Sequence, residues 1–123
     1  MVKIKGMRKT ILVVDDEAGY RDLLSLELAG HGFSVVTACD GARAAELLAA
    51  GGVDLVITDM KMPRMDGLDV LRAVKSSAPD IPVIIMTGYA VEDRAESAIR
   101  EACAFLRKPF DIAELKTAVQ NAF

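Results

Sequence analysis

Short apolar segments alternate along the chain with longer segments that have helical periodicity. The apolar segments have the length of strands, and most of them are continuous apolar runs; they span residues 11–14, 33–38, 53–58, 82–86 and 105–106. Continuous apolar runs of this kind are typical of strands that are covered on both faces of a parallel sheet. Because a helical segment follows each strand, the pattern predicts an α/β domain with a parallel sheet and right-handed crossovers.

Five helices are predicted, over residues 18–29, 40–50, 67–78, 91–101 and 112–123. Gly51-Gly52 ends the second helix, the Asp66-Gly67 turn begins the third, and Asp111 with Glu114 gives the last one a capping-box pattern. The fourth helix is the least regular, because charged residues leave it a narrow apolar face. The side chains expected to face the core are Tyr20, Leu23, Leu24, Leu28, Ala42, Ala45, Leu48, Ala49, Leu68, Leu71, Val74, Val91, Ala95, Ala98, Ile99, Ile112, Leu115, Ala118 and Val119.

The composition narrows the class of protein. The 123 residues suit one domain, and 52% apolar against 5% aromatic residues predicts an aliphatic core. No apolar run approaches the roughly 20 residues that a membrane-spanning helix needs, and no signal peptide is expected. The two cysteines stand alone, without metal-ligand spacing, which suits a reducing, cytoplasmic compartment.

The charge is unevenly distributed between the two ends of the chain. The net charge is −3, and because four cations lie within the first nine residues, the rest of the chain carries −7. An acidic domain of this kind argues against nucleic-acid binding. Residues 1–9 are expected to form a frayed tail, and residues 10–123 the folded domain.

Polar residues of complementary chemistry follow four of the predicted strands. Asp15-Asp16 follows the first strand, Asp59 the third, Thr87 the fourth and Lys108 the fifth. The carboxyl ends of parallel strands meet at one edge of the sheet, where such folds bind ligands. Three carboxylates placed together repel one another unless a cation is present, and oxygen ligands suit Mg²⁺. The sequence therefore predicts a site for Mg²⁺ and a small dianion such as a phosphoryl group, with Asp59 as a candidate nucleophile.

Each of these residues also has a purely structural interpretation. Asp15 or Asp16 could cap the first helix, and Asp59 could be a turn residue. Thr87 could belong to an ordinary loop, and Lys108 could be a solvated side chain. The functional interpretation is favoured because four separate strand ends would otherwise have to be polar in a complementary way by chance.

Four motifs, in order, resemble the receiver domain of two-component response regulators. They are Ile11-Leu12-Val13-Val14-Asp15-Asp16-Glu17, Asp59-x-x-Met62-Pro63-x-Met65-Asp66-Gly67, Thr87-Gly88-Tyr89 and Lys108-Pro109-Phe110. The resemblance covers residues 10–123. It implies a flavodoxin-like (βα)5 fold, in which a doubly wound sheet of five parallel strands has the order 2-1-3-4-5. It also implies a phosphorylation-activated signalling switch that catalyses only its own phosphotransfer and autodephosphorylation, and is otherwise not an enzyme.

The resemblance assigns roles to individual residues. Asp59 matches the phospho-acceptor, which takes its phosphoryl group from the phosphohistidine of a sensor histidine kinase or a phosphotransfer protein. Asp16 and Asp59 match direct Mg²⁺ ligands, Asp15 a ligand that acts largely through water, and the backbone carbonyl of Lys61 the third protein ligand. Lys108 is expected to pair with Asp59 and then with the phosphoryl oxygens.

The resemblance also implies an output mechanism. Thr87 and Phe105 match a switch pair, in which the hydroxyl moves toward the phosphoryl group and the ring turns inward; Phe105 could instead be an ordinary core aromatic. The surface formed by the fourth helix, the fifth strand and the last helix is then expected to change. Its target would be a downstream effector or an output domain of a longer regulator, and a homodimer through the same surface is one option. Neither nucleic acid nor membrane is expected to bind this domain.

Two local features carry their own hypotheses. The segment Arg100-Glu101-Ala102-Cys103 lacks the Gly that family members usually carry there, so the fourth helix is expected to be shortened or shifted. Lys61 and Tyr89 lie two residues after Asp59 and Thr87, and are expected to restrict attack by water on the phosphoryl group.

Two rival functions remain at this point. A Mg²⁺-dependent phosphatase with an aspartyl nucleophile would carry a second Asp two residues later, where this chain has Lys61. A binding module that has lost phosphorylation would have no need for the acidic pair, Thr87 and Lys108. The sequence does not decide between a stand-alone receiver and part of a longer regulator.

Overall fold

A parallel sheet of five strands forms the centre of the structure, a computed structural model in which residues 8–62, 66–88 and 102–123 are described. The strands have the order β2-β1-β3-β4-β5, as expected for a flavodoxin-like fold. Their bounds are Thr10–Val14 for β1, Ser34–Ala38 for β2, Leu55–Asp59 for β3, Val83–Thr87 for β4 and Ala104–Arg107 for β5.

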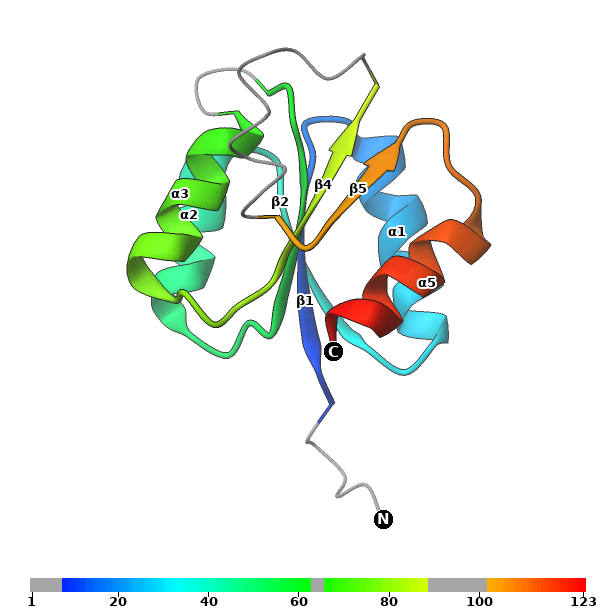
Figure 1. Ribbon diagram of the computed structural model, residues 1–123, viewed down its shortest axis with the longest axis horizontal. Coiled ribbons are helices and arrows are strands. Elements are labelled where there is room, and N and C mark those ends of the chain that lie inside the picture. Colours follow the sequence, from blue (N-terminus) through cyan, green and yellow to red (C-terminus); the bar gives the residue numbers. More distant parts are fainter. Residues whose placement is uncertain (1–7, 63–65, 89–101) are drawn as a thin grey trace.

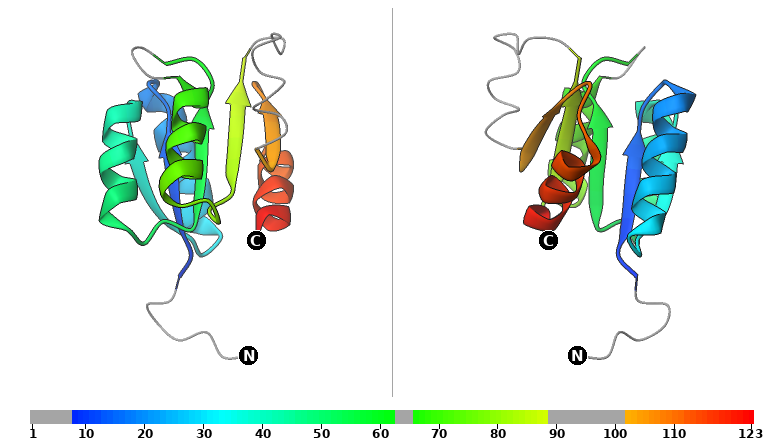
Figure 2. Two further views of the ribbon diagram at one scale, coloured as in Figure 1. Left: turned by 60° about the vertical axis from the view of Figure 1, so that its left-hand side comes forward. Right: turned by 90° about the vertical axis from the view of Figure 1, so that its right-hand side faces the viewer.

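Helices cover both faces of the sheet (Figures 1 and 2). One face carries α1 (Ala18–Gly30) and α5 (Ile112–Ala122), and the other carries α2 (Gly41–Ala50) and α3 (Gly67–Ser77). The predicted helix at 91–101, the predicted tail up to residue 7 and Tyr89 lie outside the described residues. The expectation that the missing Gly shortens the fourth helix therefore stays a prediction.

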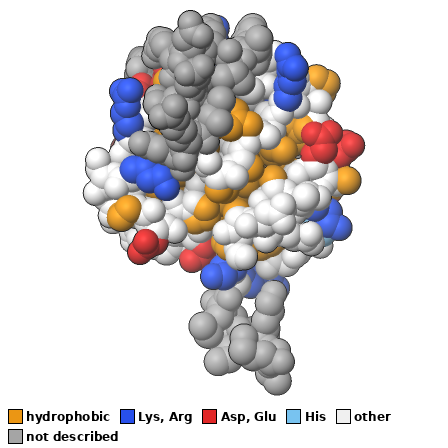
Figure 3. Space-filling view, viewed as in Figure 1, with side chains coloured by type: hydrophobic (Ala, Val, Ile, Leu, Met, Phe, Trp, Pro, Cys, Tyr) orange, Lys and Arg blue, Asp and Glu red, His pale blue; other side chains and the backbone are white. Residues whose placement is uncertain are grey.

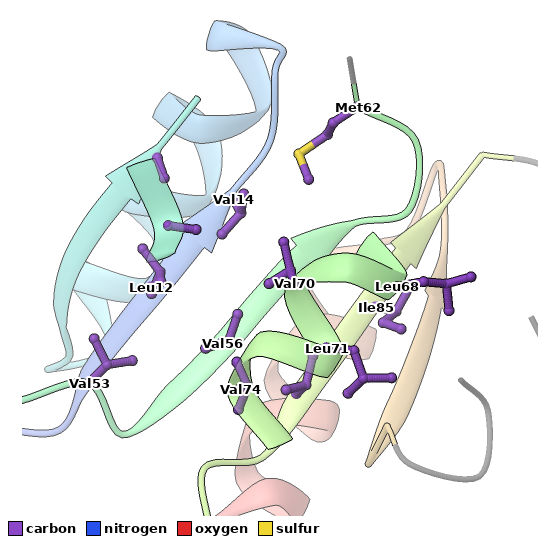
Figure 4. Close-up of a cluster of buried hydrophobic side chains, with 13 residues drawn as sticks. Leu12, Val14, Val53, Val56, Met62, Leu68, Val70, Leu71, Val74 and Ile85 are labelled. Carbon is purple, nitrogen blue, oxygen red and sulfur yellow. The ribbon is translucent and has the colours of Figure 1, made fainter. Parts of the chain in front are cut away.

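Alternate residues of each central strand enter two separate aliphatic clusters. Leu12 and Val14 of β1 pack with α2 and α3, whereas Ile11 and Val13 pack with α1 and α5. Figure 4 shows the first cluster, in which labelled side chains of β1, β3 and α3 point toward one another. These four β1 side chains are fully buried, and burial of each stabilises the fold by about 1.5–3 kcal/mol. Burial on both faces is the physical reason why the strands lack polar alternation.

The predicted core face of α2 is largely wrong. Leu48 packs against the core as predicted, but Ala42, Ala45 and Ala49 are exposed, and Ala44 and Leu47 lie against the core instead. An alanine-rich segment offers small apolar side chains on every face, so its periodicity does not fix which face is buried.

The core faces of α1, α3 and α5 are largely as expected, with one error. Leu24 and Leu28 of α1 are buried, but Leu23 is 46% exposed and Leu26 is 73% exposed. The apolar stripe of α1 is therefore narrower than predicted, and two leucines remain on its outer side.

The start of α3 lies against the end of β3. Asp66 is the N-cap: its Oδ1 accepts from the amides of Leu68 and Asp69, and Asp69 Oδ2 accepts from the Asp66 amide. A Cβ on Gly67 would lie 2.6 Å from the Asp59 carbonyl oxygen and 2.9 Å from Met60 Cα. Only glycine allows the helix to approach the strand end so closely. The helix start predicted at Asp66-Gly67 is confirmed.

Candidate functional site

An open cleft of about 390 Å³ lies at the carboxyl edge of the sheet, where the strand arrows end in Figure 1. Its lining includes the predicted site residues Asp16, Asp59, Lys61, Thr87 and Lys108. The full lining is Asp16, Glu17, Asp59, Met60, Lys61, Thr87, Gly88 and Lys108. Strand ends that are far apart in the sequence therefore bring these side chains to one place.

Asp59 is the last residue of β3 rather than the first residue of the loop. It pairs in register with Met86 of β4, and the Met60 amide donates to the Met86 carbonyl at 2.8 Å. The residue is only 7% exposed. The turn interpretation of Asp59 is therefore wrong, because the carboxylate is held by the strand ladder.

Lys108 connects two carboxylates. Its Nζ lies 2.8 Å from Asp15 Oδ2 and 3.5 Å from Asp59 Oδ2, and its side chain is 10% exposed. Its amide donates to the Thr87 carbonyl at 2.7 Å, which ties the loop after β5 to the end of β4. Lys108 is thus not a solvated side chain, and its shorter ion pair goes to Asp15, a contact that sequence reasoning missed.

Asp15 is a buried anchor beneath the cleft. Its Oδ1 accepts from the Glu17 amide at 2.9 Å, its Oδ2 accepts from Lys108, and Arg21 Nη1 donates to its carbonyl oxygen at 2.7 Å. The N-cap of α1 is Glu17, whose side chain makes no capping hydrogen bond. The cap interpretation of Asp15 and Asp16 is therefore wrong.

The charges in the site are unbalanced. Burial, and next the charge of Asp15, raise the pKa of Asp59 from the ordinary 3.8 to about 6, although Lys108 works in the opposite direction. Burial favours a lower pKa for Lys108, but its hydrogen bond to Asp15 and the charge of Asp59 outweigh burial and raise the pKa. Lys108 stays protonated, and one ammonium does not neutralise the surrounding carboxylates.

The donor set fits a hard divalent cation. Carboxylate oxygens of Asp15, Asp16 and Glu17 lie within 4.8 Å of one another. Asp59 lines the same cleft as Asp16 and Glu17, and shares Lys108 with Asp15. An all-oxygen set with excess negative charge is the chemistry that Mg²⁺ prefers. Glu17 was not predicted as part of this cluster. Its position directly after Asp15-Asp16 in the sequence was the signal that could have identified it.

Thr87 and Phe105 lie on the same face of the sheet. Thr87 ends β4, and Phe105 pairs in register with Ile85, two residues before Thr87 on that strand. Phe105 is half-buried and packs against the cluster beneath α2 and α3. This placement suits a core aromatic as well as a switch residue.

Tyr20 also contacts the site, although the helical periodicity predicted only that it faces the core. Its ring centroid lies 3.9 Å from Lys108 Nζ. No motif marked this contact, because it joins α1 to a loop 88 positions further along the chain.

Residues 11–120 match the family described as the response regulator receiver domain. The chain belongs to this family. Receiver domains are parts of two-component signalling systems, so the resemblance in the motifs is confirmed over nearly the whole chain. Among the described residues, no helix of this receiver domain is long and apolar enough to cross a membrane.

Curated relatives of this receiver domain are longer regulators. The DNA-binding transcriptional regulator NtrC of Escherichia coli (strain K12) is 41% identical over 116 residues, which are 94% of this chain and 25% of the relative. The response regulator MprA of Mycolicibacterium vanbaalenii is 40% identical over 106 residues, which are 85% of this chain and 46% of the relative. The chain thus spans about a quarter to a half of the length of these relatives.

Solved structures share the fold. A response regulator receiver domain protein from Clostridium thermocellum has a TM-score of 0.86 and 38% identity, with 93% of each chain covered. The response regulator TrrA from Thermotoga maritima, in complex with Mg²⁺-BeF, has a TM-score of 0.83 and 35% identity, with 94% of this chain and 99% of that chain covered.

Proposed function

We propose that this receiver domain accepts a phosphoryl group on Asp59, with Mg²⁺, from the phosphohistidine of a sensor histidine kinase or a phosphotransfer protein. The observation that carries the proposal is the position of Lys108 Nζ between Asp15 and Asp59. A buried ammonium, an anchored carboxylate and a second carboxylate that lines an open cleft make Asp59 the group that a phosphoryl donor can reach. We take residues 10–123 as the receiver unit.

In the transfer step, a carboxylate oxygen of Asp59 forms a bond to phosphorus. The bond between phosphorus and the donor imidazole breaks, and its electron pair returns to the imidazole nitrogen. Lys108 turns its N–H donors to the phosphoryl oxygens, and the hydroxyl of Thr87 donates to the same group. Phosphoryl transfer needs little further covalent chemistry from the protein. The other side chains of the site therefore contribute by positioning the phosphoryl group and by stabilising its charge.

The metal would be held at the acidic side of the cleft. Asp16, Asp59 and the backbone carbonyl of Lys61 would be direct ligands. Both oxygens of Asp15 already accept hydrogen bonds, from Glu17 and Lys108, which supports a role for Asp15 through water. When bound, Mg²⁺ supplies positive charge that offsets the carboxylates and the phosphoryl oxygens.

The output step would begin at Thr87. Movement of its hydroxyl toward the phosphoryl group vacates space on the face of the sheet that Phe105 also occupies, and the ring then turns inward. An open groove of about 420 Å³ is lined by Phe105, Leu106, Ala113 and Ala118, among others. Figure 3 shows a band of hydrophobic side chains across the face that carries β5 and α5. A change in this surface would reach a downstream effector, an output domain of a longer regulator, or a second copy of the chain.

The lifetime of the phosphoryl group would depend on residues around the cleft. Lys61 lines the cleft and can restrict the approach of water. We expect Lys61→Ala to accelerate autodephosphorylation, measured as loss of the added mass over time after the phosphodonor is removed. An unchanged rate would remove Lys61 from this role.

The test of the proposal uses the whole chain, Mg²⁺ and a small-molecule phosphodonor such as acetyl phosphate. Intact mass spectrometry should show the gain of one phosphoryl group. The gain should disappear in Asp59→Asn and without Mg²⁺, and should persist in the control Asp22→Asn, which alters an exposed carboxylate of α1. Undiminished phosphorylation of Asp59→Asn would contradict the proposal.

A further inference from the structure

We propose that Tyr20 is a positioning residue for Lys108, and that the face of its ring holds the ammonium beside Asp59. Lys108 Nζ lies 3.9 Å from the Tyr20 ring centroid, well within the roughly 6 Å at which a cation over an aromatic face is attracted to it. The kinetic part of this inference rests on the proposed phosphotransfer, whereas the contact itself does not.

The ring supplies a contact that the carboxylates do not. The ammonium has three N–H donors, and its two carboxylate contacts are of unequal length, 2.8 Å to Asp15 and 3.5 Å to Asp59. With the ion pairs alone, Lys108 would be drawn toward Asp15, away from the group that receives the phosphoryl. The ring adds a neutral contact, and since the lysine side chain is only 10% exposed, water competes little with it.

Tyr20 is itself held in place by the loop that carries Lys108. Its ring lies 6.1 Å from the ring of Phe110, centroid to centroid, at an interplanar angle of 54°. Both rings pack against the buried cluster beneath α1 and α5. Phe110 lies two residues after Lys108, so Tyr20 ties both the ammonium and its loop to α1.

A neutral ring suits a lysine that must change partners. When the phosphoryl group arrives, Lys108 has to reach its oxygens, and a further carboxylate would compete for the ammonium and add negative charge to a site already rich in it. An aromatic face attracts the cation without a formal charge and leaves its N–H donors available. The hydroxyl of Tyr20 is not needed for this role, so a phenylalanine should replace it.

The first arm of the test is the NMR spectrum of the metal-free protein. Lys108 methylene and ammonium signals, identified by their loss in Lys108→Arg, should show the upfield shift of groups over a ring face. The shift should persist in Tyr20→Phe and largely disappear in Tyr20→Leu. Unchanged Lys108 signals in Tyr20→Leu would overturn the inference, whether or not the protein is phosphorylated.

The second arm is the rate of phosphorylation by a small-molecule phosphodonor with Mg²⁺. We expect Tyr20→Leu to be about 2- to 30-fold slower, which corresponds to the range of cation–π strengths, and Tyr20→Phe to stay within about twofold of the wild type. Leu26→Ala, which truncates a side chain that is 73% exposed on the same helix, is the matched control and should leave the rate unchanged. Equal losses in Tyr20→Phe and Tyr20→Leu would overturn the inference.

Two further measurements separate the possible failures. Thermal melting establishes that each variant is folded, and Tyr20→Met replaces Tyr20→Leu if the latter does not fold. Absence of phosphorylation in the wild type would contradict the proposed function, and the NMR arm would still decide whether Tyr20 holds Lys108.

Discussion

At the scale of single residues, Asp59 carries its charge in a place that disfavours it. It is 7% exposed and close to Asp15 and Asp16, so burial and repulsion both disfavour its ionised form. The charge of Lys108 offsets only part of this effect. A protein does not gain stability from such a group, so its position indicates a function.

The sequence allowed the location of Asp59 to be predicted, because a charged residue at the end of an apolar strand needs partners. It did not allow the prediction of the Lys108–Asp15 pair or the Tyr20 ring, since these contacts depend on side-chain geometry between distant segments.

The charge of Asp59 leads to a prediction on stability. Its folded-state pKa, about 6, lies above the ordinary 3.8. The protonated form of Asp59 is therefore favoured in the folded state. As the pH rises from 3.8 to about 6, ionisation of Asp59 lowers the free energy of unfolding, and above pH 6 this loss is complete. At pH 7.5 with a chelator, Asp59→Asn should raise the free energy of unfolding by on the order of 2 kcal/mol.

Urea unfolding of wild type and Asp59→Asn at several pH values checks this. The difference in the free energy of unfolding between wild type and Asp59→Asn should become smaller as the pH is lowered from 7.5 to 4. Asp22→Asn should have the same free energy of unfolding as the wild type at every pH. A variant that is less stable than the wild type at pH 7.5 would show that the carboxylate is not destabilising.

At the scale of secondary-structure elements, α3 begins in close contact with the strand that ends at Asp59. Gly67 lets the helix start against the end of β3, where a Cβ would lie 2.6 Å from the Asp59 carbonyl oxygen. The strands and the start of α3 at Asp66-Gly67 could be predicted from the sequence because continuous apolar runs and helix-start residues act locally. The face of α2 could not, because its alanines leave the helix without a clear apolar side.

Gly67→Ala should push α3 away from the strand end. Since the clash involves backbone rather than a flexible side chain, we expect a loss of about 1–3 kcal/mol in the free energy of unfolding and slower phosphorylation. Gly19→Ala is the matched control, because nothing lies within 4 Å of the added Cβ. That change should be neutral or slightly stabilising, since alanine favours helix. Equal stability of the two variants would contradict the close approach.

At the scale of the whole molecule, the parallel sheet brings together site residues that lie between positions 15 and 108 of the sequence. Strand–helix alternation predicted the fold class, but the order β2-β1-β3-β4-β5 came from the resemblance to receiver domains and not from periodicity. Periodicity describes which face of an element is buried, and it holds no information about which strands become neighbours.

Binding of Mg²⁺ to this edge of the sheet should stabilise the entire fold, because ligand that binds only the folded state shifts the unfolding equilibrium. The melting temperature of the wild type should rise with Mg²⁺ concentration. The rise should be much smaller in Asp16→Asn, which removes a proposed ligand, and undiminished in Asp22→Asn. A similar rise in all three proteins would point to unspecific ion binding.

Chemical location of the phosphoryl group tests most directly whether Asp59 is the phospho-acceptor. After phosphorylation with a small-molecule donor and Mg²⁺, borohydride reduces an aspartyl phosphate to homoserine, which peptide mass spectrometry assigns to one position. We expect homoserine at position 59 and none elsewhere. Reduction at another aspartate, or a phosphorylated protein in which position 59 remains aspartate, would contradict it.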